Sequence, residues 1–149
     1  MSYNVNLGIN IKNKKILNEL IKIYLLKFSH ETYLINKQVR SCAWLDLPEE
    51  LVPYAEQALM NLFKSDNIQY YILPFDLMAD NHIYGHIQIF LYRYNWQKQL
   101  FIHFINKRNT LIGDFIFGKL LGYSDISINE YFLKNNIKDL EKCDVNYCN

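Results

Sequence analysis

Three of the four histidines lie close together along the chain, and histidine is the residue best suited to bind a metal ion or transfer a proton near neutral pH. They are His82, His86 and His103, all within the stretch NHIYGHIQIFLYRYNWQKQLFIHFINKR at 81–108. Alternating apolar residues indicate that this stretch is β-strand. His82 and His86 would then stand about 13 Å apart, at roughly 3.3 Å per residue, which is too far to bind one metal ion. We therefore expect no metal site.

The same stretch divides at Asn95 and Trp96 into two candidate strands, which predicts a central hairpin over about 83–105. A loop of two residues would gather the aliphatic residues on one face. On the other face, His103 would lie opposite Gln88 and diagonal to His86. The cluster of His86, Gln88 and His103 is therefore the candidate for a catalytic or ligand-binding pocket.

The alternative for this cluster is a set of half-buried sheet residues that bond only to their neighbours. No Asp or Glu lies on the two candidate strands to orient a histidine, although Asp76, Asp80 or Asp114 could approach through folding. The sequence contains no GxSxG, GxGxxG, HExxH or CxxC motif, and GKLLGY at 118–123 lacks the spacing of a phosphate-binding loop. These features favour a protein that is not an enzyme and needs no cofactor, with a small enzyme or ligand-binding protein as the alternative.

Aromatic residues make up 15% of the chain, more than one core of this size requires. Several gather at the predicted hairpin tip, and aromatic side chains exposed at such a tip anchor protein interfaces. The predicted binding residues are Tyr92, Arg93, Tyr94, Trp96 and Lys98. We therefore expect a non-enzymatic interaction protein that binds, and in one version inhibits, a protein partner, or that self-associates.

The charged residues are unevenly distributed, although the net charge is only +1. Residues 1–40 carry seven Lys or Arg and two Asp or Glu, whereas residues 41–80 carry one and seven. This asymmetry predicts a basic and an acidic side. Nucleic-acid binding is the third possible function, with bases stacked on the tip aromatics and phosphates held by Arg93, Lys98, Lys107 and Arg108. The basic excess is weaker than a general nucleic-acid binder requires.

Composition also bears on where the protein acts. The longest apolar runs fall far short of the roughly 20 residues that cross a bilayer, and no basic-then-apolar leader opens the chain. Cys42, Cys143 and Cys148 show no paired spacing, which favours free thiols in a reducing compartment. We expect a cytoplasmic protein without membrane contact. The abundance of Ile, Asn, Lys and Tyr is typical of an AT-rich genome, which a virus or a mobile element would fit.

Hydrophobic periodicity predicts the elements that position these residues. Alternation predicts a strand over 3–12, and a spacing of 3.6 residues after the capping residue Asn13 predicts a helix to Phe28. The remaining predicted elements are strands at 32–35, 39–45 and 68–75, a helix capped by Asp46, a helix capped by Thr110 and stopped by Gly122, and a helix whose capping box is Ser127 and Glu130.

Chain length sets the domain organisation. With 149 residues, half of them apolar, the chain is long enough for one core and too short to expect two. We predict a single α+β domain over 1–149: a mainly antiparallel sheet packed by about four helices, with 141–149 a flexible polar tail. Gly113 and Gly118 fall inside a predicted helix, where glycine costs about 1 kcal/mol relative to alanine, so we expect a close approach there, with packing of this helix on the sheet as the ordinary explanation.

Overall fold

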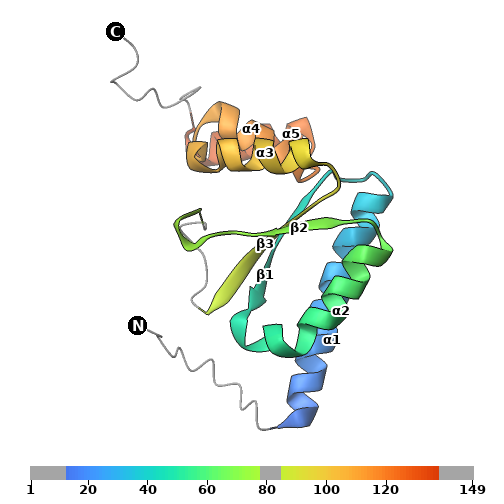
Figure 1. Cartoon of the computed structure of the whole chain (residues 1–149). Helices are drawn as coiled ribbons and strands as arrows, with labels where there is room; N and C mark the ends of the chain where they lie inside the picture. Colours follow the sequence, from blue (N-terminus) through green and yellow to red (C-terminus); the bar gives the residue numbers. More distant parts are fainter. Residues whose placement is uncertain (1–12, 78–84, 138–149) are drawn as a thin grey trace.

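The computed structural model describes residues 13–77 and 85–137, and the predicted strand over 3–12 and tail over 141–149 lie outside them. The described part has the predicted α+β fold, with an antiparallel sheet and helices packed on it (Figure 1). In this part of the chain, no helix is long and apolar enough to cross a membrane.

The sheet has three described strands: β1 (Ala43–Pro48), β2 (Gln69–Ile72) and β3 (His86–Tyr92). Their order is β1-β3-β2, and β3 pairs antiparallel with both neighbours. Ile89 of β3 lies opposite Leu45 on one side and Ile72 on the other. Of these three strands, the last along the chain is therefore the central one.

The predicted hairpin over 83–105 is wrong in its second half, because β3 leads directly into helix α3 (Asn95–Phe104). Gln97, Phe101 and Ile105 are all buried, which is the spacing of four residues that one face of a helix produces. Gln97 also starts the helix, since its Oε1 accepts the N–H groups of Arg93 and Tyr94, both at 2.9 Å. The apolar spacing of a short segment can match both the two-residue repeat of a strand and the 3.6-residue repeat of a helix. Here the tertiary packing stabilises the helix.

Side chains of β3 alternate between two cores. Ile89 and Leu91 face a core shared with α1 (Lys14–Asn36) and α2 (Val52–Ser65), which lie side by side in Figure 1. Phe90 and Tyr92 face a second core shared with α3 and α4 (Leu111–Leu120). Strand alternation thus joins two helical layers through one sheet.

Helix α1 begins where predicted, with the Asn13 side chain accepting the Lys15 N–H at 3.1 Å. It continues to Asn36, so the predicted strand at 32–35 is wrong. Thr32 and Ile35 are buried on the same face as Phe28, because a spacing of three to four residues keeps them on one side of a helix. The strand predicted at 39–45 forms as β1, shifted toward the C-terminus.

Helix α2 and strand β2 lie close to their predicted positions. The predicted cap is wrong, because Asp46 belongs to β1 and lies opposite Gln88. A short 3-10 turn over Glu49–Leu51 precedes α2, and Pro53 falls in the first turn of the helix, where no backbone donor is lost. The strand predicted at 68–75 forms over Gln69–Ile72.

The end of the described chain forms two packed helices, α4 and α5 (Asp125–Asn135). Thr110 caps α4 as predicted, accepting the Gly113 N–H at 3.2 Å, and Gly122 ends the segment at a φ of 83°. For α5 the cap is Ser124, which accepts the Ser127 N–H at 3.2 Å. The predicted Ser127 box is therefore wrong by one turn, since Asp125 and Ile126 already belong to the helix.

Cys42 lies at the junction of β1 and α4, where its side chain is fully buried and its N–H donates to the Leu120 carbonyl at 2.9 Å. Burial raises the pKa of this thiol to about 12. In a Cys143→Ser, Cys148→Ser variant, we expect Cys42 to resist an aromatic disulfide reagent at pH 8 and to react fully once guanidinium unfolds the chain. A reaction in the native state at the rate of an exposed thiol would contradict this packing.

Candidate functional site

The predicted histidine cluster is not assembled. His86 and Gln88 share one face of β3 and are buried, but His103 lies on α3, where it is exposed and its ring meets Phe104 edge-on at 4.8 Å. The residues across the sheet from His86 and Gln88 are Pro48 and Asp46 of β1. The predicted position of His103 depended on the hairpin, so it is wrong for the same reason.

The described residues offer no alternative metal centre. Within 13–77 and 85–137, no three His, Cys, Asp or Glu side chains are close enough together to hold a metal ion. His86 and Gln88 are buried side chains of β3, whereas the more conservative interpretation of the sequence expected half-buried residues.

The five predicted binding residues fall into three environments. Tyr92 is buried and stacks on Phe90, with ring centroids 5.8 Å apart, and this burial raises the pKa of its phenol. Lys98 is half-buried and its ammonium lies 4.9 Å from the centroid of the Tyr71 ring. Arg93, Tyr94 and Trp96 remain together where β3 passes into α3.

Tyr94 and Trp96 are the exposed members of this group, at 56% and 58% of their full accessible surface. Tyr94 has extended backbone angles as the residue before α3, and Trp96 sits in the first helical turn. Gln97 fixes their backbone by accepting two N–H groups, and its amide donates to the Ser41 carbonyl at 3.4 Å. Both aromatic rings are thus presented to solvent from a firmly held turn.

These aromatics border a groove of about 270 Å³, which we name the Arg40–Arg93 groove. Its lining comes from the end of α1, the segment before β1, and the start of α3. It includes Gln38, Arg40, Arg93, Tyr94, Trp96 and Gln97. Residues separated by more than fifty positions in the sequence therefore form one site.

Two guanidinium groups give the groove its charge. Arg40 pairs with Glu31 at 2.5 Å, and Arg93 donates to the side-chain oxygen of Asn36. The Nε atoms of both arginines are buried without a hydrogen-bond partner among the described residues. Because Asn36 is neutral, its contact does not offset the charge of Arg93, and a buried N–H without a partner favours an incoming acceptor. The groove suits an anionic group flanked by apolar surface.

Sequence reasoning found one side of this groove and missed the other. Arg93, Tyr94 and Trp96 were identified from aromatic clustering, whereas Arg40 and Gln97 were not. Arg40 lies two residues after Gln38, which has a left-handed φ of 58° in the turn between α1 and β1. The only local feature that could have pointed to Arg40 is its residue type, because arginine is rare in this chain, with three arginines against thirteen lysines.

No protein-family model matches this chain, and a search of curated proteins found none similar to it.

Proposed function

We propose that this chain is a non-enzymatic binding protein that acts in the cytoplasm on a protein partner, held at the Arg40–Arg93 groove. The single observation that supports this proposal is the pairing of two largely exposed aromatic rings, Tyr94 and Trp96, with two arginines that have unpartnered Nε atoms. Trp, Tyr and Arg are the residues that dominate binding energy at protein interfaces. Inhibition of the partner would follow if the covered surface were the partner's own active surface.

The chemistry of the groove narrows the class of partner. A carboxylate or phosphate on the partner would accept from the guanidinium groups, while an adjacent apolar side chain would pack on Trp96. Ile35 supplies an aliphatic side chain to the lining beside the aromatic rings. The partner segment is therefore expected to combine an acidic group with a neighbouring hydrophobic residue.

Trp96→Ala is the variant that tests this proposal. We expect it to weaken the complex by at least about 30-fold, the loss typical of a binding hot spot, because it removes the largest exposed ring without touching a core. The partner would be captured from native extract by the wild-type chain, identified by mass spectrometry, purified, and titrated against both proteins by calorimetry.

A matched control is Tyr54→Ala, which removes an aromatic ring that is 53% exposed on α2. This variant should bind the same partner within about twofold of wild type, since surface changes outside an interface are nearly neutral. Equal retention of the partner by Trp96→Ala would refute the proposal. Capture of nucleic acid alone, with an affinity that falls steeply with salt, would favour the third function instead.

A further inference from the structure

A second cavity lies between α4 and α5 and shares no lining residue with the Arg40–Arg93 groove, and we name it the α4–α5 pocket. Its volume is about 400 Å³, within the range of about 300–1,000 Å³ that is usual for small-molecule sites. Its lining includes the apolar side chains of Phe117, Leu121 and Ile128, the aromatic rings of Tyr123 and Tyr131, the Ser127 hydroxyl and the Asp114 carboxylate. The walls are thus mainly apolar or aromatic, with one carboxylate.

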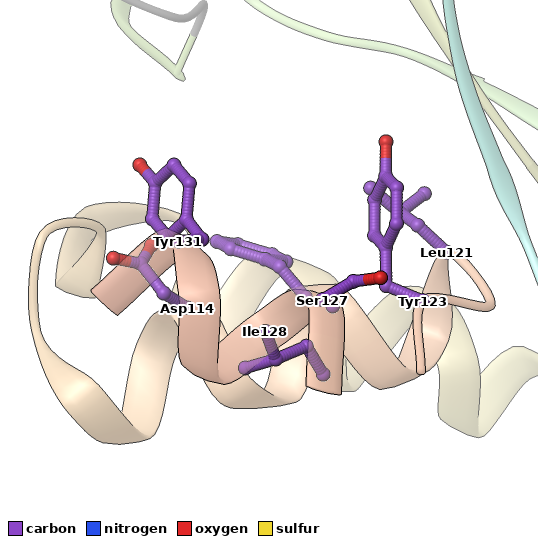
Figure 2. Close-up of a pocket in the computed structure, with 8 residues that line it drawn as sticks. Asp114, Leu121, Tyr123, Ser127, Ile128 and Tyr131 are labelled. Atoms are coloured by element: carbon purple, nitrogen blue, oxygen red, sulfur yellow. The ribbon is translucent and has the colours of Figure 1, made fainter. Parts of the chain in front are cut away.

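Figure 2 shows how the polar groups are placed. Asp114 and Tyr131 lie side by side at one end of the pocket, whereas Tyr123 and Leu121 stand together at the other end. Ser127 lies between the two ends. A ligand that fills the pocket therefore meets a carboxylate at one end and an aromatic ring with an aliphatic side chain at the other.

The carboxylate of Asp114 is incompletely satisfied. It receives a hydrogen bond from the Asn109 backbone, but its Oδ2 is buried without a hydrogen-bond partner among the described residues. The charge of Arg108 acts to lower the pKa of Asp114; the Arg108 Nε donates to the Ile105 carbonyl at 2.9 Å, and its guanidinium lies 6.0 Å from the Trp44 ring centroid. Arg108 does not line the pocket. A ligand donor would supply the missing hydrogen bond.

We propose that the α4–α5 pocket binds a small organic ammonium ion that carries an apolar or aromatic substituent. The ammonium N–H groups would donate to the Asp114 carboxylate beside the Tyr131 ring, and the substituent would pack between Leu121 and Tyr123. A cation beside the face of an aromatic ring is also attracted by the negative electrostatic potential of that face, which would add to the binding energy. This site is separate from the Arg40–Arg93 groove and requires no protein partner.

The test is titration of the full chain with 2-phenylethylamine, followed by calorimetry and by backbone NMR shifts. The matched neutral probe is 2-phenylethanol, which has a similar shape but no charge. We expect saturable binding of the amine at least about tenfold tighter than that of the alcohol, since hydrogen bonds to charged groups are the strong kind. The largest shifts should fall on residues 114–131. Equal affinities, or shifts centred elsewhere, would overturn the proposal.

Asp114→Asn is the variant that isolates the carboxylate, because Asn keeps the side-chain oxygen that accepts from Asn109. Burial raises the pKa of Asp114, against smaller opposing effects of the Asn109 bond and Arg108, while Tyr131 faces it from α5. A carboxyl group whose pKa is higher in the folded state than in the unfolded state destabilises the folded protein at neutral pH. This destabilisation disappears as the pH falls through the raised pKa and the group becomes protonated. The Asn variant should therefore melt no lower than wild type at pH 7, yet lose affinity for the amine at least about tenfold.

A second variant keeps the test decisive if the first disturbs the fold. Ser127 is exposed at the side of the pocket, so Ser127→Phe should fill the space and abolish amine binding while leaving Asp114 in place. Unchanged binding by either variant would overturn the assignment. Nα-acetyl-lysine methylamide separates a free amine from a protein lysine, and tighter binding of this peptide mimic than of 2-phenylethylamine would refute a small-molecule site.

Discussion

Phe101→Ala is expected to lower the free energy of unfolding by about 3–5 kcal/mol, the usual cost of truncating a fully buried phenylalanine. Phe101 is completely buried, and its ring contacts three others: Phe90 at a centroid distance of 4.0 Å, Trp44 at 5.2 Å and Phe117 at 5.5 Å. These rings come from β3, β1 and α4. The substitution would therefore leave a cavity where the sheet meets the second helical layer.

The measurement is urea denaturation followed by fluorescence and far-ultraviolet circular dichroism. Phe115→Ala is the matched control, because Phe115 lies on α4 but is 42% exposed, and we expect it to cost less than about 1 kcal/mol. Similar losses for the two variants would contradict the packing described here. Since Phe101 holds α3 against the sheet, its truncation should also loosen the turn that presents Trp96.

Gly113→Ala is expected to destabilise the protein by about 1–3 kcal/mol, the cost of forcing extra volume into a packed site. The expected loss of stability is opposite to the effect of helix propensity, which alone would make the Ala variant more stable by up to about 1 kcal/mol. A Cβ at this position would lie 2.0 Å from the Lys107 carbonyl oxygen, so the backbone itself would have to move. That oxygen already accepts the Thr110 hydroxyl at 2.6 Å, and Thr110 caps α4.

Gly118→Ala separates this backbone clash from a general effect of helix substitution. There the added Cβ would meet side-chain atoms of Ile128 at 2.6 Å and 2.7 Å, and a side chain can rotate where a backbone carbonyl cannot. We expect a smaller loss for Gly118→Ala than for Gly113→Ala, measured by urea denaturation of both variants. The reverse order, or a stabilised Gly113→Ala, would show that the corner before α4 is less rigid than the structure indicates.

Local signals predicted much of the helical structure. Asn13 and Thr110 cap their helices as expected because a side-chain oxygen that accepts a backbone N–H depends only on residues two or three positions away. The two glycines of α4 are points of close approach, but their neighbours are Lys107 and Ile128, so the expected packing of this helix on the sheet does not explain them. In these cases the relevant neighbours lie within about twenty residues.

The errors arose where long-range packing chooses between two acceptable local patterns. Residues 95–104 alternate well enough for a strand, but burial of Phe101 against Trp44 and Phe117 requires a helix. The misplaced strand carried His103 to Gln88 and produced the wrong histidine cluster. Trp96 was still correctly predicted to be exposed. A residue at this point of the chain is exposed whether the chain forms a hairpin tip or, as here, begins a helix. Arg40 was missed because the other side of its groove comes from Arg93 and the start of α3, more than fifty residues along the chain.

The central position of β3 has a consequence for how the protein is made. In the described sheet, β1 and β2 bond only to β3 and not to each other. A ribosome releases the chain from its N-terminus, so both outer strands emerge before the strand that joins them. Until residue 92 has left the exit tunnel, the nascent chain therefore lacks the strand that joins β1 and β2 in the described sheet. We expect the described sheet to form late and cooperatively, because β3 makes the hydrogen bonds to both β1 and β2. The same strand also contributes side chains to both hydrophobic cores.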